Sequence, residues 1–330
     1  MKRKVALMMA AVFVLATPLT GCAIGDTEFV LDLNSVGKKD YVFSINGTTC
    51  SQEEAKLYLC NYQNIYGYEY GVNLWKQDFG QVVSEDSLEN YVKDVTLSEL
   101  ANIVCMNLLA KEQELTLTEV EKTRVKVAAE EYYDSLSNAE ISYMGIDKNM
   151  LAGFYEKYAI AQKLFDTLTQ GVNEEVSDDE ARVIRIQQIY VKDQKTAEQV
   201  KTKLAGKDDF ATMASNYNEA DTIEITLKRG VYPAEVDAVA FQLDNGEQSD
   251  MIATSDGYYF IKCISKYEKE LTEQNKIDII AQRRKEQFED LFQGFVKESV
   301  FEMNEEMWES IEIDTSGAIT TNSFFDVYNK

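Results

Sequence analysis

The sequence VIRIQQIYV at residues 183–191 and the sequence GYYFIKCI at residues 257–264 decide the fold of the second half of the chain. Both are short runs rich in β-branched and aromatic residues, a composition typical of strands. Between them the pattern predicts helices at 196–204, 209–215 and 235–241, with a turn at Gly230. The order of elements therefore predicts a small domain in which strands flank three helices.

The regions on both sides of this small domain have a helical pattern. Apolar residues recur at helical spacing at 87–112 and 148–169. The capping boxes Ser51-x-x-Glu54 and Thr118-x-x-Glu121 predict two further helices, at 51–66 and 118–136. A later charged helix carries one apolar stripe from Ile277 to Phe295, which it cannot bury alone. We therefore expect it to return to the N-terminal helices. The expected fold class is α+β, a mainly helical domain of N-terminal helices plus a returning C-terminal helix, with an inserted α/β domain.

The composition excludes several classes of function. The chain has 330 residues, with 33 Lys and Arg against 57 Asp and Glu, and its formal net charge is −24. Because this charge opposes binding to a phosphate backbone, we expect no nucleic-acid partner. The sequence contains no histidine, which excludes Ser-His-Asp and Cys-His catalysis and histidine metal ligands. We expect neither a cofactor nor a metal.

The first residues are typical of an export signal. Lys2 to Lys4 precede an apolar run at 5–16, and Leu19-Thr20-Gly21-Cys22 follows. The last motif resembles a bacterial lipobox, which implies cleavage before Cys22 and lipidation of that cysteine. An ordinary secretory peptide or a short anchor helix is the alternative. The expected location is the extracytoplasmic face of the cell membrane, with the chain held there by its lipid.

Several short pieces follow one another in a fixed order along the chain. They are Val42-Phe43-Ser44-Ile45-Asn46-Gly47, Val176-Ser177-Asp178-Asp179-Glu180-Ala181, Ile189-Tyr190-Val191-Lys192, Asp209-Phe210-Ala211, Ala240-Phe241-Gln242-Leu243 and Gly257-Tyr258-Tyr259-Phe260-Ile261-Lys262. In this order they resemble the SurA/PrsA type of extracytoplasmic foldase, a helical chaperone domain with an inserted parvulin-type (PpiC-type) peptidyl-prolyl isomerase domain. The resemblance implies a signal peptide at 1–21, a lipidated tether at 22–40, a SurA-like helical domain at 41–175, a parvulin-like domain at 176–268 and a C-terminal helix and tail at 269–330.

The same resemblance implies where a catalytic site lies. Two histidines of the parvulin polar cluster correspond here to Gln188 and Tyr259, and its Asp or Cys corresponds to Ala220. The proline-pocket positions are Tyr232, Val236 and Phe241, of which only Phe241 keeps the residue type of the family. Isomerisation must lower a barrier of roughly 18–20 kcal/mol without any proton transfer. A Gln188–Tyr259 pair is able to hydrogen-bond across a sheet, but the loss of both histidines predicts a degenerate site.

Four tyrosines at the end of the first predicted helix form a second candidate surface. They are Tyr62, Tyr66, Tyr68 and Tyr70. Aromatic side chains give broad contact with little sequence preference, so these residues are able to line a cradle for client chains. Packing in the core, or an ordinary loop, is the favoured interpretation.

Three functions remain open on these observations. The leading hypothesis is a membrane-anchored chaperone or foldase that assists secreted proteins, whose partners are unfolded or nascent polypeptides and whose parvulin-like domain has little or no isomerase activity. The alternative is an active parvulin-type peptidyl-prolyl cis-trans isomerase. The second alternative is a lipoprotein that binds a solute or a wall component.

Overall fold

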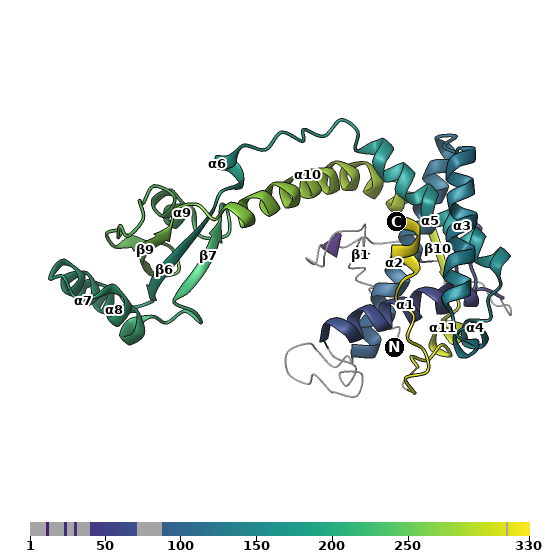
Figure 1. Cartoon of the computed structure of the whole chain (residues 1–330), viewed down its shortest axis with the longest axis horizontal. Helices are drawn as coiled ribbons and strands as arrows, with labels where there is room; N and C mark the ends of the chain where they lie inside the picture. The colour runs from purple at the N-terminus through teal and green to yellow at the C-terminus, as the bar shows by residue number, and fades with distance from the viewer. Residues whose placement is uncertain (1–10, 13–22, 25–29, 32–39, 71–87, 315) are drawn as a thin grey trace. The chain divides into compact units, whose positions relative to one another are not determined.

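The computed structural model describes residues 11–12, 23–24, 30–31, 40–70, 88–314 and 316–330. The chain divides into two compact units. The helical unit contains residues 1–170 and 287–330, and the small unit contains residues 171–286 (Figure 1). The predicted lipidation site Cys22 and the side chain of Tyr70 lie outside what the structure describes.

Five helices form the first part of the helical unit. They are α1 (Gln52–Tyr70), α2 (Leu88–Glu112), α3 (Glu119–Ser135), α4 (Asn138–Met144) and α5 (Lys148–Leu168). The predicted capping box of α3 is present, because the Glu121 N–H donates to Thr118 Oγ1 at 3.3 Å and the Thr118 N–H donates to Glu121 Oε2 at 2.6 Å. Local sequence thus sets the start of this helix.

The C-terminal residues add a strand to a small sheet in the helical unit. The strand order is β3 (Val30–Leu31), β10 (Val300–Met303), β4 (Phe43–Ile45) and β5 (Thr48–Cys50). In the central pair β10 is antiparallel to β4, with Phe301 opposite Ile45 and Met303 opposite Phe43. β1 (Ala11–Val12) and β2 (Ala23–Ile24) form a separate antiparallel pair.

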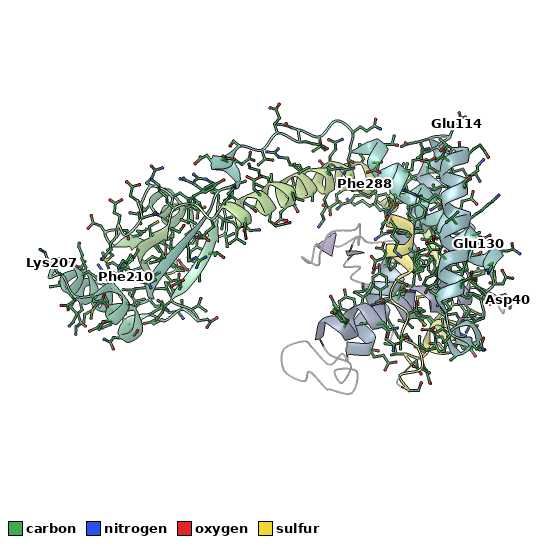
Figure 2. All side chains as sticks on the ribbon, viewed as in Figure 1. Asp40, Glu114, Glu130, Lys207, Phe210 and Phe288 are labelled. Carbon is green, nitrogen blue, oxygen red and sulfur yellow. The ribbon has the colours of Figure 1, made fainter. Side chains whose placement is uncertain are left out.

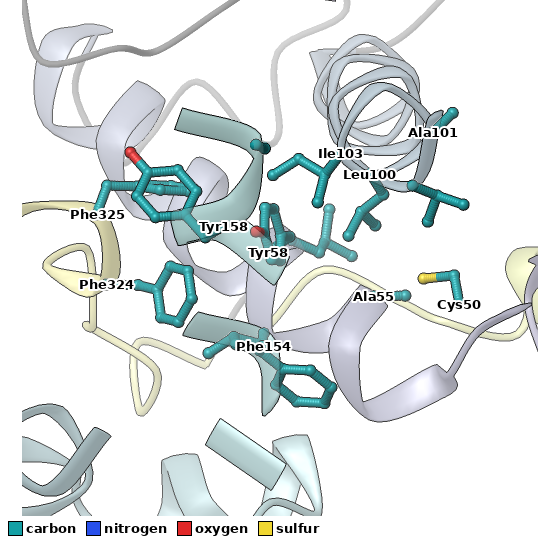
Figure 3. Close-up of a cluster of buried hydrophobic side chains, with 14 of the residues drawn as sticks. Cys50, Ala55, Tyr58, Leu100, Ala101, Ile103, Phe154, Tyr158, Phe324 and Phe325 are labelled. Carbon is teal, nitrogen blue, oxygen red and sulfur yellow. The ribbon is translucent and has the colours of Figure 1, made fainter. Parts of the chain in front are cut away.

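The core of the helical unit is largely aromatic. Figure 3 shows Tyr58 of α1, Tyr158 of α5 and the C-terminal Phe324 and Phe325 in one buried cluster. The last elements of the chain are α11 (Glu305–Glu309) and α12 (Phe324–Asn329). Trp308 of α11 is also buried. The C-terminal segment is therefore part of the core of this unit.

Helix α10 (Lys269–Glu298) carries the predicted apolar stripe. In the helical unit its Phe288 packs 5.2 Å from the Phe165 ring of α5, and Phe288, Phe292 and Val296 are buried there (Figure 2 marks Phe288). The return of this helix to the N-terminal helices is confirmed. The stripe is only partly buried, however, since Ile277 and Leu291 are each 53% exposed.

The small unit is built on an antiparallel sheet of order β7-β6-β9-β8. Its strands are β6 (Val183–Val191), β7 (Glu224–Lys228), β8 (Ile252–Ala253) and β9 (Tyr258–Ser265). Its helices are α6 (Asp178–Ala181), α7 (Gln194–Ala205), α8 (Phe210–Tyr217) and α9 (Ala234–Ala240). Two separate hydrophobic clusters lie in this unit, one with α9 and one with α7 and α8, as alternation along β6 and β9 requires. The α+β fold class is confirmed.

Several details differ from the prediction. The helix predicted at 196–204 begins at Gln194, because Asp193 Oδ2 accepts the Thr196 N–H at 2.8 Å and so acts as the N-cap. Tyr62 and Tyr66 are buried, as the favoured interpretation required, whereas Tyr68 is 84% exposed. Within the described ranges, none of the helices combines the length and the apolar content that a membrane crossing requires.

Candidate functional site

The site positions implied by the sequence gather on one face of the small sheet. Gln188 of β6 is opposite Ile261 of β9, and Tyr190 is opposite Tyr259. Because side chains alternate along a strand, Gln188 and Tyr190 share the face that carries Tyr259. Tyr259 and the pocket positions Tyr232, Val236 and Phe241 all belong to the cluster on this face.

Gln188 is buried, and both polar atoms of its side chain have partners. Its Oε1 accepts a hydrogen bond from the Tyr232 hydroxyl at 3.0 Å, and its Nε2 donates to the Thr222 carbonyl at 3.0 Å. Its backbone N–H donates to the Ile223 carbonyl at 2.8 Å. The side chain is only 2% exposed. Gln188 is therefore fixed between the loop before β7 and the loop before α9.

Tyr259 is also fixed by neighbours. Its hydroxyl donates to Asp256 Oδ2 at 3.1 Å, and its ring packs 4.7 Å from Tyr190 and 5.9 Å, edge-on, from Tyr232. Burial, followed by the Asp256 carboxylate, raises the pKa of Tyr259 above its usual value. The phenol is thus a hydrogen-bond donor at neutral pH. Tyr232 contacts both Gln188 and Tyr259, and those two side chains bond other groups rather than each other.

The glycine before Tyr259 is required by the packing of Tyr190. Gly257 has φ +156°, and a Cβ added to it would lie 2.6 Å from Tyr190 Cε2 and 2.8 Å from the Val191 carbonyl oxygen. The Tyr190 hydroxyl donates to the Asp256 carbonyl at 2.6 Å. A glycine directly before β9 therefore allows the backbone of Gly257 to approach the Tyr190 ring closely at this end of the sheet.

Ala220 lies in the loop between α8 and β7 and supplies only a methyl group. The polar side chain in this loop is Asn218, whose Nδ2 donates to the Ala220 carbonyl at 2.8 Å and whose Oδ1 accepts from the Tyr190 N–H at 3.0 Å. The sequence interpretation missed Asn218. The available signal was an asparagine directly after a helix, where its short side chain commonly bonds nearby backbone.

Two arginines cover the ring of Phe241. The Arg229 guanidinium carbon lies 4.3 Å from the ring centroid and the Arg182 guanidinium carbon 5.4 Å from it. Arg182 Nη2 also donates to the Phe241 carbonyl at 2.9 Å. Both arginines pair with Asp179 Oδ1, at 3.1 Å from Arg182 and 3.0 Å from Arg229. The cover of Phe241 by arginine was not identified from the sequence, since Phe241 lies 59 residues after Arg182.

The remaining pocket positions are buried or half-buried. Val236 of α9 is fully buried, Phe241 is 4% exposed, and Tyr232 is half-buried with its hydroxyl bound to Gln188. The structure thus brings together five of the six implied side chains, and Ala220 joins them only through the loop that Asn218 organises. No group of three or more Asp, Glu or Cys side chains in the described part of the chain is arranged to hold a metal ion.

The sequence of the small unit matches a known family of domains. Residues 172–278 match the family described as the PPIC-type PPIASE domain. The foldase protein PrsA of Caldanaerobacter subterraneus is 27% identical over 280 residues, which cover 79% of this chain and 82% of that protein. Foldase protein PrsA 3 of Bacillus anthracis is 37% identical over 101 residues, which cover 28% of this chain and 35% of that protein.

One solved structure is also similar to this chain. The crystal structure of the peptidylprolyl isomerase PrsA from Bacillus cereus is 23% identical, with a TM-score of 0.39, and the match covers 73% of this chain and 91% of that one. The resemblance expected from the sequence is confirmed, since the chain is similar to PrsA-type foldases and residues 172–278 match the PpiC-type isomerase domain.

Proposed function

We propose that this protein is a membrane-anchored extracytoplasmic chaperone that assists the folding of secreted proteins, and that its parvulin domain has little or no isomerase activity. The single observation that carries the second part is the state of the site. The polar side-chain groups of Gln188, Tyr232 and Tyr259 are all hydrogen-bonded to other protein groups. In addition, Arg229 covers the Phe241 ring.

A substrate proline needs a free apolar face, and the twisting amide needs polar groups that bind it more strongly in the transition state than in the ground state. Here Gln188 is 2% exposed and Tyr259 is 7% exposed. To reach a peptide, either side chain must first break a bond that it already makes. This supports a domain that serves as a scaffold.

The test compares two activities of the purified protein. Exchange NMR on a series of proline peptides measures cis-trans interconversion, and light scattering measures aggregation of an unfolded secreted protein. We expect unchanged interconversion rates together with suppressed aggregation. Accelerated interconversion would contradict the proposal.

A matched pair of variants identifies the source of any isomerase activity. Tyr259→Phe removes the hydroxyl that faces Asp256, whereas Tyr258→Phe makes the same chemical change in the cluster on the other face of the sheet. Loss of turnover in Tyr259→Phe but not in Tyr258→Phe would establish the active isomerase. The contact of Tyr232 with both Gln188 and Tyr259 is the observation that favours this alternative.

The anchoring rests on Cys22, in the sequence Leu19-Thr20-Gly21-Cys22. Lipidated Cys22 would hold an acidic chain at a membrane surface that its own charge does not favour. Fractionation of cells that make the Cys22→Ser variant tests this part, and we expect the variant to leave the membrane fraction. Equal membrane retention of the variant would refute a lipid anchor at this residue.

A further inference from the structure

The C-terminal tail of the helical unit, made of Asp314 and residues 316–330, is held largely through its backbone. Gln63 makes a two-point contact with Asp314, since Gln63 Nε2 donates to the Asp314 carbonyl at 2.5 Å and the Asp314 N–H donates to Gln63 Oε1 at 3.2 Å. Asn64 Nδ2 donates to the Thr321 carbonyl at 2.8 Å. Side chains of α1 therefore bind main-chain atoms of the tail.

Other helices of the same unit continue this pattern. Glu140 Oε1 accepts the N–H groups of both Thr320 and Thr321 at 2.8 Å, and Asn61 Oδ1 accepts the Phe324 N–H at 3.1 Å. The Tyr155 hydroxyl donates to the Phe324 carbonyl at 2.8 Å. Burial acts to raise the pKa of Glu140, but its backbone hydrogen bonds outweigh that effect and lower it, so the carboxylate is charged where it meets the tail.

The tail also places two phenylalanine rings against tyrosines of the helices. The Phe324 ring stacks 4.2 Å from Tyr155, and the Phe325 ring lies 5.4 Å from Tyr62 and 5.5 Å from Tyr58. Figure 3 labels Phe324, Phe325 and Tyr58. We call the surface made by these tyrosines and by the side chains that hold the tail backbone the tail-binding surface. It lies on α1, α4 and α5.

Such contacts do not select for one amino-acid sequence. Every residue except proline offers the same backbone N–H and carbonyl groups, and tyrosine rings accept any aromatic side chain. Between Asp314 and Phe324 the described part of the tail forms no strand or helix, and α12 is only six residues long. The tail is thus bound in the way that proteins bind extended peptides, with main-chain bonds for affinity and ring pockets for preference.

We propose that the tail-binding surface is a binding site for extended, aromatic-containing segments of unfolded client proteins, and that the tail occupies it as an intramolecular competitor. This proposal rests on the proposed chaperone function and names where a client binds and what regulates it. A tethered competitor lowers the apparent affinity for a client in proportion to the fraction of molecules whose surface is free. Release of the tail therefore switches the site on.

The first experiment uses the unmodified protein. The probe is a peptide with the sequence of residues 316–330, SGAITTNSFFDVYNK, added at about 1 mM to match the effective concentration of a tethered segment. Hydrogen exchange of the Thr320, Thr321 and Phe324 amides is followed with and without the peptide. We expect faster exchange at these amides and no change at β9. A peptide with both phenylalanines replaced by alanine is the matched control, and should leave the exchange unchanged.

The second experiment weakens the competitor and leaves the surface intact. The variant Phe324→Ala/Phe325→Ala is compared with Phe292→Ala, an equally buried ring of α10 that is not part of the tail. We expect the labelled peptide to bind the tail variant roughly tenfold more tightly than the unmodified protein, as removal of a conformational competitor predicts. Phe292→Ala should bind like the unmodified protein. If the tail variant does not fold, the exchange experiment still decides.

Three results would overturn the proposal. These are tail amides that stay protected at full peptide occupancy, equal binding by the tail variant and Phe292→Ala, and a tail-dependent dimer, which would make a second copy the occupant. Failure of this proposal is distinguishable from failure of the chaperone function. Aggregation suppression without tail displacement refutes only the site, whereas tail displacement without suppression refutes the chaperone function.

Discussion

A buried phenylalanine lies in the core of each unit, and the two are held by different chemistry. Phe324 of the helical unit contacts uncharged rings, with Tyr155 at 4.2 Å and Tyr132 at 5.4 Å. Phe241 of the small unit lies under two guanidinium groups that both pair with Asp179. A site lined by uncharged aromatic rings accepts the ring of another chain readily. A site covered by an arginine that is paired with a carboxylate accepts a ligand only after the arginine has moved. A retained phenylalanine therefore does not by itself preserve a pocket.

The largest effect is expected from Phe324→Ala. The ring contacts five other rings of the helical unit and is fully buried. Its removal should lower the free energy of unfolding by roughly 3–5 kcal/mol. Urea unfolding followed by near-UV circular dichroism measures this loss. Amide NMR signals of the small unit should not move, and a shift of both units together would contradict their separate stabilisation.

The next effect concerns polar groups without partners. Glu99 of α2 is 4% exposed, and its Oε2, like the hydroxyls of Tyr58 and Tyr62, has no hydrogen-bond partner among the described residues. Tyr158 is also close enough for electrostatic interaction with Glu99, which adds to the effect of burial in raising the pKa of Tyr158. Burial raises the pKa of Glu99 to about 8 from 4.5. In the small-unit site, by contrast, Gln188 has partners on both polar atoms.

The sign of the resulting pH dependence follows from proton binding. Between pH 4.5 and about 8 the folded chain keeps a proton on Glu99 that the unfolded chain has lost. Stability should therefore fall as pH rises through this window, by up to about 1.4 kcal/mol per pH unit, and level off above it. Glu99→Gln should remove this slope in urea unfolding at a series of pH values.

Glu54→Gln is the comparison for Glu99→Gln, because burial also raises the pKa of Glu54 while its pairing with Lys157 opposes that shift. Glu54 is equally buried, but it pairs with Lys157 at 2.6 Å. Its replacement should destabilise the helical unit, because Lys157 loses its partner. Parallel pH profiles of the unmodified protein and Glu99→Gln would show that Glu99 is not the source of the slope.

The smallest effect is expected from Tyr232→Phe. It removes the donor of the 3.0 Å bond to Gln188 Oε1 and leaves that acceptor buried. The small unit should lose about 1 kcal/mol of stability, the usual cost of such a change. Tyr258→Phe, in the cluster on the other face of the sheet, serves as the reference in the same thermal unfolding measurement. Equal values for the two variants would show that the Tyr232 bond contributes nothing.

Local signals in the sequence were sufficient for much of the fold. The capping box of Thr118 and Glu121 sets the start of α3 through residues three apart, and alternation along β6 places Gln188 on the face that Tyr259 shares. By contrast, β10 was not predicted. The four residues of β10 form a strand by pairing with β4, and about 250 residues separate the two segments, so no local sequence pattern indicates the pairing.

The candidate site shows the same limit. Its positions could be assigned one by one, but not their partners. Tyr232 lies in a loop, so no periodic pattern indicates that its hydroxyl reaches Gln188. The cover of Arg182 and Arg229 over Phe241 likewise depends on Asp179, which precedes β6. Side-chain pairing across the fold is decided by tertiary packing, which a single sequence does not display.

The pairing of β4 with β10 also sets an order of folding. Phe43–Ile45 are synthesised early, yet their partners at Val300–Met303 emerge only after all 116 residues of the small unit, Gly171–Glu286. During synthesis from the N-terminus, the residues of the small unit are therefore complete before those of the helical unit. Helices α1 to α5 lack their remaining packing partners, β10 and the C-terminal Phe324 and Phe325, until the end of the chain is made. The helical unit is therefore the part of this protein that stays incompletely folded for longest during synthesis.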